Sequence, residues 1–535
     1  MRMLRSKAKR SLAVMLGGAI ALFLLIVYHP SASTPQETSG PFTWAVSSLE
    51  RINRTAAPRA ASAPIALFAA RGEYEAFQIA IRAPETGLTN VTLSVSDLQD
   101  AANNILAKTN IALYREHYVQ VKNTSPSSIG DANSSLGGGW YADALIPFAD
   151  SSYPVDLAQA QFSAVPFNLD PSINQPIWVE IFVPRTTPAG RYQGTYTVSS
   201  DQGTVTDSFQ LTVWNFELPL VPSLNSTFTF WNRKDSKPAM EELLKHRLMP
   251  DTPALEPADQ PELIRKWGLR SLRLPFWSGA NIDNCAMEPA PSIAELKAEA
   301  ALHNPSLSLY VYSADEIDEC TNLYEPMRQW ANNIHQAGLK NLVVMTPTPE
   351  LYDAVDIWVV LPEQYESARA EIEAAKQRGD EIWFYTALLQ DSYSPKWLID
   401  FTPLNYRLPH GLISQSLDLE GALYWAADYW IGEPWQRFQA YEGEDGNFPG
   451  EGMLLYPGEP AGVDGVIPSI RLKWVRDGVE DYEYIEQLKR LGRGDWALGL
   501  SRSVAADWRN WTRDPKALAS VRKQLGEELE RLSAL

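Results

Sequence analysis

The stretch "LSLYVYSADEIDECTNLYEPMRQWANNIHQAGLKNLVVMTP", residues 307–347, indicates the fold class of this chain. It starts with an apolar run at 307–313 and continues with a segment of helical periodicity at 324–338. A second apolar run follows at 341–347. Strand, helix and strand in this order form the repeating unit of a parallel sheet. The same order recurs on both sides of this stretch.

The alternation extends over roughly 230 residues and predicts a closed (β/α)8 barrel at 223–490. The eight candidate strands are "STFTFW" (226–231), "SLRLPFW" (271–277), "LSLYVYS" (307–313), "NLVVMTP" (341–347), "DIWVVLP" (356–362), "EIWFYTA" (381–387), "GALYWAA" (421–427) and "GMLLYPG" (452–458). The segment "RLMP" (247–250) is a competing strand that would displace one of these eight. An open doubly wound sheet is the alternative fold, but the sequence has neither a Gly-rich phosphate loop nor a dinucleotide fingerprint.

Residues 41–222 have a period of two, which predicts an antiparallel β-sandwich. In "IWVEIFV" (177–183) apolar residues alternate on one face, and "FQLTVWNF" (209–216) begins in the same way. Gly, Pro, Asn and Ser separate such runs. No catalytic constellation stands out in this domain, so we expect it to be a scaffold or a rim of the substrate site. The last segment, 491–535, predicts a short helical tail.

Residues 1–40 predict a targeting segment and a polar linker. Five positive charges in "MRMLRSKAKR" (1–10) precede an uncharged apolar stretch at 11–28. This order is typical of a signal peptide or of a retained membrane anchor, and "SAS" (31–33) is only a weak cleavage signal. In both cases the positive flank stays in the cytoplasm. We therefore expect the rest of the chain to be exported to the periplasm or the extracellular space.

The composition argues against several classes of function. The net charge is −19 and there is no basic block, which argues against a nucleic-acid partner. The six His are scattered and the two Cys form no zinc motif, so we expect no metal and no other cofactor. The acidic segment 315–319 lacks the spacing and the central Gly of a calcium loop. The 18 Trp and 22 Tyr favour either large aromatic cores or stacking platforms for sugar rings.

Asp315 and Glu316 directly follow the candidate strand 307–313. In a (β/α)8 barrel the chemistry takes place at the carboxyl ends of the strands, which singles out this pair. The same dipeptide at 318–319 is expected in a solvated loop or first helical turn, where acids favour the helix dipole. The dipeptide at 380–381 precedes its strand and would lie at the opposite end of the barrel. Asp315 and Glu316 are therefore the candidate catalytic residues.

Adjacent carboxylates cannot easily flank one sugar, as the two carboxylates of the usual glycosidases do. Two mechanisms remain open. In the first, Glu316 works with a carboxylate from another strand end, either Asp391 or Asp428. In the second, the substrate supplies its own nucleophile, the 2-acetamido oxygen. The Asp of the pair then polarises the acetamido N–H, while the Glu protonates the leaving oxygen.

Two segments of the predicted barrel carry distinctive motifs, "GALYWAADYW" (421–430) and "GEGMLLYPG…PSIRLKWVRDGVEDYEYIEQL" (450–488). With the order of sandwich, barrel and Asp-Glu pair, they resemble glycoside hydrolase family 123 over most of the chain. The resemblance implies a β-N-acetylgalactosaminidase that works by acetamido-assisted retention. It also implies that Asp315 stabilises the acetamido group and that Glu316 is the general acid/base. Such sites often continue Asp-Glu-Pro, whereas Ile317 follows here.

Aromatic residues at the predicted strand ends are the candidates for substrate binding. Trp277, Tyr385, Trp425 and Trp430 line either the pocket or the core. The hydroxyl of Tyr385 would suit a donor to the acetamido carbonyl. Asp428 either binds sugar hydroxyls or caps the following loop.

The segment "SIRLKWVRDGVEDYEYIEQL" (469–488) predicts an amphipathic barrel helix, because its apolar residues fall near helical spacing. Its charged residues are expected to form structural ion pairs and not to contact substrate. These residues are Arg471, Arg476, Asp477, Glu480 and Asp481.

The two cysteines follow neighbouring strands of the predicted barrel. Cys285 comes after the run 271–277 and Cys320 after the run 307–313, so both belong to loops on the same barrel face. In an oxidising compartment they would be able to form a disulfide, and two free thiols are the alternative.

Taken together, these patterns predict an exported or membrane-anchored glycoside hydrolase of N-acetylhexosamine-containing glycans. Its expected partner is an oligo- or polysaccharide, and it would meet a membrane only through residues 11–28. Two alternatives remain: a two-carboxylate hydrolase of non-acetylated sugars, and a non-catalytic polysaccharide-binding or cell-envelope protein.

Overall fold

The computed structural model describes residues 40–535 apart from short gaps. The gaps are 59–63, 127–132, 150–154, 159, 234–235, 253–254, 436–440, 444–445 and 534–535. The predicted targeting segment lies outside the described residues, so its cleavage or retention stays a prediction. No helix in the described part of the chain is long and apolar enough to cross a membrane. Residues 39–535 form one compact unit, and the predicted boundaries at 222 and 490 stay predictions within it.

Two β-sheets form the N-terminal region. The first sheet has the order β1 (Phe42–Ser47), β3 (Tyr74–Arg82), β10 (Asn174–Phe182), β7 (Ile111–Val121) and β8 (Gly139–Pro147). The second has the order β2 (Ala66–Arg71), β12 (Gly203–Glu217), β11 (Gly190–Ser200), β4 (Leu88–Val95) and β9 (Phe167–Leu169). In addition, β5 (Leu98–Asp100) pairs with β11, and β6 (Ile105–Leu106) pairs with β5. The strand pairs are antiparallel as predicted, except that β2 and β12 run parallel.

The first sheet is buried on both faces, which the alternation in the sequence does not reveal. In β10, Val179 is paired with Phe77, whose ring lies 5.0 Å from that of Phe209 in the second sheet. Glu180, which follows Val179 in β10, points to the opposite face, where Lys473 of α9 (Ile470–Arg490) donates to it at 2.9 Å. One face of this sheet therefore completes the sandwich and the other packs on a helix.

Eight parallel strands form a nearly closed barrel. Their order is β14 (Pro250–Asp251), β13 (Asn225–Thr229), β20 (Gly421–Tyr424), β19 (Glu381–Tyr385), β18 (Ile357–Val360), β17 (Lys340–Val344), β16 (Ser308–Asp315) and β15 (Ser271–Arg273). Pairing of β13 with β20 joins the beginning of the barrel to its end. Within the described residues, the backbone ladder is interrupted between β14 and β15.

Seven of the eight predicted strands are confirmed, and the last one is wrong. The run 452–458 contains β23 (Leu455–Pro457), which forms a separate antiparallel hairpin with β24 (Val466–Pro468). It is apolar because it is buried against the sandwich, where Tyr456 donates to Asp143 of β8 at 2.7 Å. The missing barrel strand is β14, which begins within the competing segment 247–250. Its two residues are too few to show a periodicity.

Side chains bridge the interruption of the barrel, which we call the seam. Arg273 ends β15 and donates to the carboxylate of Asp251, the last residue of β14, at 3.0 Å. Thr229, at the end of β13, donates to the same carboxylate oxygen at 3.1 Å. An ion pair thus stands at the seam where the backbone ladder is missing.

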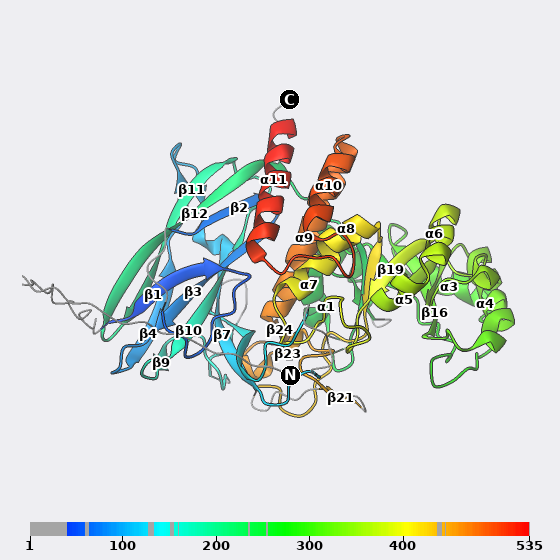
Figure 1. Ribbon diagram of the computed structural model, residues 1–535, viewed down its shortest axis with the longest axis horizontal. Coiled ribbons are helices and arrows are strands. Elements are labelled where there is room, and N and C mark those ends of the chain that lie inside the picture. The colour runs from blue at the N-terminus through cyan, green and yellow to red at the C-terminus, as the bar shows by residue number, and fades with distance from the viewer. Residues whose placement is uncertain are drawn as a thin grey trace, which may run out of the picture. The chain divides into compact units, whose positions relative to one another are not determined.

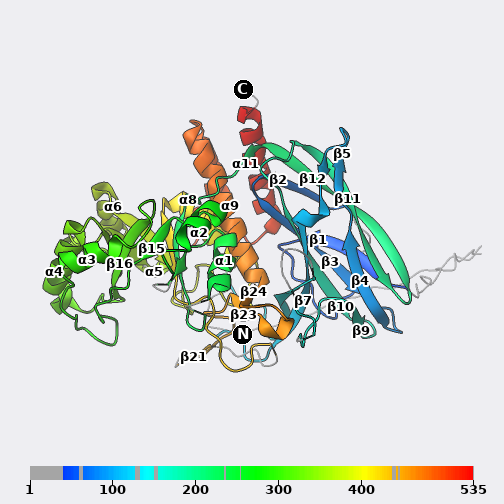
Figure 2. The same cartoon turned by 180° about the vertical axis from the view of Figure 1, so that it is seen from behind.

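Helices follow most of the barrel strands. They are α1 (Lys237–Lys245), α2 (Gln260–Trp267), α3 (Ile293–Ala300), α4 (Tyr324–Gln336), α5 (Pro362–Ser367), α6 (Arg369–Arg378), α7 (Leu404–Leu408), the short π-helix η4 (Pro409–Ile413) and α8 (Ser414–Leu417). Short elements complete the chain: the 3₁₀ turns η1 (Lys108–Asn110), η2 (Thr321–Leu323), η3 (Pro349–Leu351) and η5 (Glu459–Ala461), and the hairpin β21 (Tyr441–Gly443) and β22 (Gly446–Phe448). Figure 1 shows α3 and α4 beside β16, and Figure 2 shows α1 and α2 next to each other on the side of α9.

The long helix α9 packs against both domains and against the tail (Figure 1). Its neighbours are α7, α8 and η4 on the barrel side, β8 of the sandwich, and the tail helices α10 (Gly494–Val504) and α11 (Pro515–Ser533). The prediction of an amphipathic helix is wrong, because nearly all residues of α9 are buried. A helix between two domains has no face left for solvent.

The charged residues of α9 form buried ion pairs, as predicted. The pairs are Arg471–Asp143, Arg476–Glu180, Arg476–Asp477, Arg247–Glu480 and Arg407–Asp481. Arg471 donates to both carboxylate oxygens of Asp143 in β8, at 2.8 Å each, and both side chains are fully buried. Removing one partner of such a pair leaves an uncompensated buried charge, which typically costs about 3–5 kcal/mol.

The predicted helical tail is present and is fastened to the rest of the molecule. The ring of Trp214 in β12 lies so close to α11 that a Cβ at Gly526 would approach it to 2.2 Å, so only glycine fits there. Arg522 of α11 also donates to Glu73 at the start of β3 and to Asp481 of α9.

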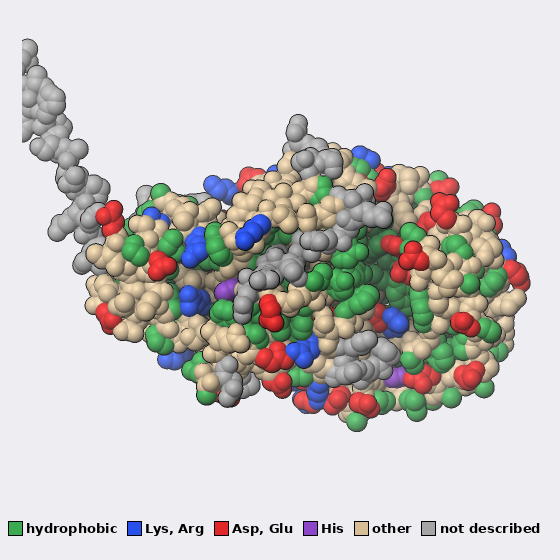
Figure 3. Space-filling model, turned by 90° about the horizontal axis from the view of Figure 1, so that it is seen from below, with side chains coloured by type: hydrophobic (Ala, Val, Ile, Leu, Met, Phe, Trp, Pro, Cys, Tyr) green, Lys and Arg blue, Asp and Glu red, His purple; other side chains and the backbone are tan. Residues whose placement is uncertain are grey.

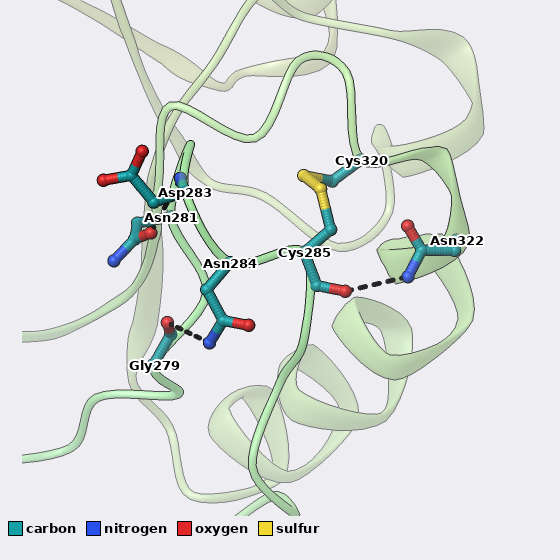
Figure 4. The surroundings of a disulfide bond; sticks show 7 residues. All are labelled: Gly279, Asn281, Asp283, Asn284, Cys285, Cys320 and Asn322. Atoms are coloured by element: carbon teal, nitrogen blue, oxygen red, sulfur yellow. Dashed lines mark hydrogen bonds between the residues drawn. A yellow bond between two sulfur atoms is a disulfide. The ribbon is translucent and has the colours of Figure 1, made fainter.

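Cys285 and Cys320 form a disulfide, with their Cα atoms 5.3 Å apart (Figure 4). Both lie in loops after barrel strands, on the face where the sequence placed them. Asn322 supports the bridge by donating to the carbonyl of Cys285 at 2.9 Å. Cys320 comes four residues after Glu316, so the disulfide braces the loop that follows the candidate acid.

Thiol titration of the unfolded, unreduced protein should therefore find no free thiols in the Cys285–Cys320 pair. Reduction should lower the free energy of unfolding by about 3–4 kcal/mol, because the bridge closes a loop across a separation of 35 residues. The matched control is the double variant Cys285→Ser, Cys320→Ser, which should unfold like the reduced protein. Two reactive thiols per chain before reduction would contradict the bridge.

Candidate active site

A cavity of about 490 Å³ opens at the carboxyl ends of the barrel strands. Its wall includes the last residues of four strands: Thr229 (β13), Arg273 (β15), Asp315 (β16) and Tyr385 (β19). Figure 3 shows the molecule from below, relative to the view of Figure 1, with hydrophobic side chains around a hollow on this face. The cavity thus lies where the fold predicts chemistry.

A bulge in β16 turns Asp315 into this cavity. The pairing of β16 with β17 skips one residue between Tyr312 and Ala314. Side chains of a strand alternate, so without the bulge Asp315 and Tyr312 would point to opposite faces. With the bulge they meet, and the hydroxyl of Tyr312 donates to Oδ1 of Asp315 at 2.7 Å.

Burial raises the pKa of Asp315 to about 6. The hydrogen bond from Tyr312 and the charge of Arg273 oppose this rise, while the neighbouring Glu316 adds to it. Asp315 is therefore a carboxylate that ionises close to neutral pH, which is typical of catalytic groups.

A left-handed backbone brings Glu316 to the same cavity. Its φ is +49°, a conformation that costs a non-glycine residue roughly 1–3 kcal/mol and is often found at functional sites. The hydroxyl of Tyr385, from β19, donates to Oε1 of Glu316 at 2.7 Å. Burial and the charge of Glu316 raise the pKa of Tyr385 well above its usual range, so the phenol remains a donor. Each carboxylate of the pair is thus held by its own tyrosine.

The second Asp-Glu pair lies outside the cavity lining. Asp318 accepts from the backbone N–H of Thr346 at 2.9 Å and from the amide of Gln364 at 3.2 Å. Asp318 lies in a loop, as expected, but it is half-buried and its side chain ties this loop to Thr346 and to α5. Glu319 is exposed, as expected.

The two alternative partners for Glu316 are engaged elsewhere. Asp391 accepts from the N–H and hydroxyl of Ser394 and pairs with the buried Lys396 at 3.0 Å. Asp428 is fully buried, and its oxygens accept the N–H groups of Trp231, Asn232 and Arg233. Asp428 therefore caps the loop after β13, and not the loop that follows Asp428 itself, as the sequence suggested. Neither carboxylate lines the cavity.

Three of the four predicted aromatic residues line the cavity: Trp277, Tyr385 and Trp425. Trp277 is 39% exposed, and its ring stands edge-on to Tyr312 at 5.6 Å. Trp430 is not part of the lining, and its indole N–H donates to the carbonyl of Leu455 at 2.7 Å. Partly exposed aromatic rings around two carboxylates suit the apolar face of a sugar.

Sequence reasoning missed several lining residues: Tyr312, Arg273, Trp231, Tyr441 and Gln390. The sequence does contain a signal for Tyr312. Tyr310 and Tyr312 are two residues apart in one strand, so their side chains lie on the same face of the sheet. Trp231 is 52% exposed and donates its indole N–H to the carbonyl of Trp425 at 2.9 Å. No local pattern identifies it, because the contact spans almost 200 residues of sequence.

Glu451 supports the cavity wall from behind. It is buried and accepts from the indole N–H of Trp425 at 2.6 Å and from the N–H of Leu388 at 3.1 Å. Burial raises its pKa to about 7, although these hydrogen bonds oppose the rise. Gly452 is required next to it, because its φ is +69° and a Cβ would lie 2.5 Å from the ring of Trp425.

The described residues contain no group of three or more His, Cys, Asp and Glu side chains suited to holding a metal ion.

Two family models match the chain. Residues 51–200 match the glycoside hydrolase 123 N-terminal domain, and residues 313–488 match the glycoside hydrolase 123 catalytic domain. Together they cover more than half of the chain. The catalytic-domain match includes Asp315, Glu316 and Tyr385. No curated protein matches the chain.

Among solved structures, the fold is similar to that of a family 123 glycoside hydrolase from Clostridium perfringens, studied for glycolipid glycan hydrolysis. The two share 14% sequence identity over 92% of this chain and 99% of that chain, with a TM-score of 0.62. A β-glucuronidase from Parabacteroides merdae is 9% identical over 69% of this chain and 46% of its own, with a TM-score of 0.25. That value is too low to support an argument.

The substitution Asp315→Asn should stabilise the protein at neutral pH. The folded-state pKa of Asp315 is raised from 3.8 to about 6, so the ionised group destabilises the folded state above pH 6 and is neutral in both states below pH 4. The gain in Tm of the variant should therefore be larger at pH 7.5 than at pH 4. Glu319→Gln, at an exposed position, is the control. An equal gain at both pH values would contradict the raised pKa.

The substitution Glu451→Gln should destabilise the cavity wall. A carboxylate accepts both N–H groups, whereas an amide has one acceptor oxygen, so one buried donor loses its partner. The expected loss is about 1–3 kcal/mol in the free energy of unfolding, measured with urea. Glu433→Gln, at an exposed position, should change it little. Equal stability of the two variants would show that Glu451 does not hold the wall.

Proposed function

The chain belongs to glycoside hydrolase family 123, and from this premise we propose that it is a retaining β-N-acetylhexosaminidase. The substrate's 2-acetamido group would act as the nucleophile, with Asp315 orienting it and Glu316 as general acid/base. That the chain is a glycosidase follows from its catalytic domain. The sugar, the mechanism and the roles of the residues are our proposal.

One observation carries this proposal: the cavity contains two adjacent carboxylates, and its described lining contains no third one. Asp315 and Glu316 are neighbours in the chain and enter from the same strand end, so they cannot lie on opposite sides of one sugar ring. A two-carboxylate mechanism needs a partner across the cavity. Asp391 and Asp428, the alternatives, are absent from the lining, and their oxygens accept backbone N–H groups.

The geometry suggests a division of labour between the two carboxylates. The acetamido oxygen would attack the anomeric carbon while Glu316 gives its proton to the leaving glycosidic oxygen. An oxazolinium ion forms, and its N–H donates to the ionised Asp315, whose charge stabilises the developing positive charge. Water, deprotonated by Glu316, then opens this ion. Two inversions give overall retention.

The tyrosines fit these roles. Tyr312 keeps one oxygen of Asp315 occupied and leaves the other for the acetamido group. Tyr385 donates to Glu316 in the absence of substrate, which positions the acid. In the complex, this hydroxyl is also suited to donate to the acetamido carbonyl, as expected from the sequence.

For the sugar itself, the family resemblance favours N-acetylgalactosamine in β-linkage. The similar Clostridium perfringens protein acts on glycolipid glycans, and we propose the same class of substrate here. The basic and apolar N-terminal segment supports export of the chain, as does the disulfide, since disulfides persist in oxidising compartments.

Hydrolysis of nitrophenyl N-acetyl-β-galactosaminide and of nitrophenyl β-galactoside tests the proposal directly. The two substrates share a leaving group and differ in the acetamido group. Turnover should be confined to the first, and proton NMR should show the β-anomer as the initial product. Comparable turnover of both would favour the two-carboxylate mechanism.

Substitutions at the two carboxylates should separate their roles. Glu316→Gln should lose about 10²–10⁴-fold in kcat on an unactivated glycan, and much less on nitrophenyl glycosides, which need little protonation. Asp315→Asn should lose about 10²–10³-fold on both, because an amide cannot balance the charge of the oxazolinium ion. Glu319→Gln is the matched control and should keep full activity.

Full activity of Glu316→Gln on an unactivated glycan would end the acetamido-assisted mechanism. The carboxylates to test next would then be Asp391 and Asp428. An Asp318→Asn variant is unsuitable as a neutral control, because Asp318 holds Thr346 and Gln364.

A further inference from the structure

A second cavity, of about 600 Å³, lies between the sandwich and the outer side of the barrel. The first sheet contributes Tyr74, Glu180 and Phe182, α9 contributes Lys473 and Arg476, and the ends of α1 and α2 contribute His246 and Trp267. Figure 2 shows α1 and α2 at this place beside α9. In the described part of the chain it shares no lining residue with the catalytic cavity.

His246 offers this cavity a hydrogen-bond acceptor. The side chain is 1% exposed, and its Nδ1 lies 2.7 Å from the carbonyl oxygen of Glu242, so Nδ1 must carry the hydrogen. Burial and the nearby charge of Lys473 lower the pKa of His246 to about 3, which keeps the ring neutral. Its Nε2 is therefore a lone-pair acceptor, and no described residue donates to it.

Trp267 offers the cavity a hydrogen-bond donor. Its indole N–H is buried and has no acceptor among the described residues. The ammonium groups of Lys266 and Lys245 lie over its ring, 5.0 and 5.6 Å from the ring centre. A buried donor without a partner destabilises the protein, and a ligand that accepts from it would relieve this.

The two cations that α9 contributes to this cavity are already paired with carboxylates, which argues against an anionic ligand. Lys473 and Arg476 donate to the two oxygens of Glu180 at 2.9 and 2.6 Å. Burial alone would raise the pKa of Glu180, but these two cations hold it well below its usual range. Arg476 also donates to Asp477 at 3.0 Å, so a phosphate or carboxylate would compete with two carboxylates for these two cations.

The remaining wall suits a sugar. Tyr74 and Phe182 form an aromatic pair with ring centres 4.8 Å apart, which offers an apolar surface to the C–H face of a ring. A hydroxyl group both donates and accepts, so hydroxyls of one ligand would satisfy both His246 and Trp267. The volume lies within the range of roughly 300–1,000 Å³ that holds small ligands.

We propose that this cavity is a second, non-catalytic binding site for a neutral sugar. It would hold a glycan at the junction of the two domains while the barrel cavity performs hydrolysis. The proposal does not depend on the acetamido-assisted mechanism.

Each cavity contains a half-buried alanine, which allows a crossed experiment. Ala112→Trp would fill the second cavity, and Ala387→Trp would fill the catalytic cavity. Lactose and N-acetylgalactosamine are titrated into each protein by calorimetry, and turnover of a nitrophenyl glycoside is measured in parallel. Ala112→Trp should lose the second binding event and keep turnover. Ala387→Trp should lose turnover and keep that event.

Trp267→Phe provides a milder test that keeps the ring and removes only the N–H. It should weaken the second binding event about tenfold, as expected for one hydrogen bond, and leave turnover unchanged. A single binding event that Ala387→Trp removes would overturn the proposal, as would second-site binding unaffected by both Ala112→Trp and Trp267→Phe. Absence of turnover in the wild type would count against the proposed function instead, because binding events are counted independently.

Discussion

The wall of the catalytic cavity depends on the buried ion pair between Arg471 and Asp143. Asp143 belongs to the sandwich and Arg471 to the helix between the domains, so the pair fixes one domain to the other. The third guanidinium nitrogen of Arg471, Nη1, donates to the carbonyl of Gly450 at 2.8 Å. The next residue is Glu451, which holds Trp425 in the catalytic cavity. The planar guanidinium makes all three bonds at fixed angles, which a lysine would not be able to do. The sandwich is thereby part of the support of the active site, although none of its described residues belongs to the lining.

The crowding of four carboxylates within five positions is resolved by giving each one different surroundings. Asp315 and Glu316 enter the cavity, each bonded to a tyrosine hydroxyl from a different strand. Asp318 turns to backbone and amide donors, and Glu319 turns to solvent. Two departures from regular geometry are needed for this, a bulge before Asp315 and a left-handed residue at Glu316. Local strain is the cost of pointing adjacent side chains to one site.

Sequence patterns predicted seven strands of the barrel and the strand end at which Asp315 and Glu316 lie, because both depend on local signals. Seven strands appear as apolar runs, and Asp315 directly follows one of them. The errors concern contacts between distant segments. β14 is too short to show a pattern. The burial of α9 is not visible in its own sequence, because its charged residues pair with partners such as Asp143, which lies more than 300 residues away. For the same reason no spacing distinguishes Trp425, which lines the cavity, from Trp430, which does not. The bulge that aims Asp315 is likewise invisible in the amino-acid order.

At the seam of the barrel, the distance between two neighbouring strands is set by the reach of side chains and not by peptide geometry. A backbone ladder fixes this distance near 4.8 Å, whatever the residues are. At the seam, the contact between Arg273 and Asp251 takes over this role, and Arg273 also lines the catalytic cavity. A substitution of Arg273 or Asp251 would change the distance between β15 and β14, and with it the width of the barrel, without breaking any strand pairing. In evolutionary terms, the seam is a place where cavities of different width can arise from one scaffold by single substitutions.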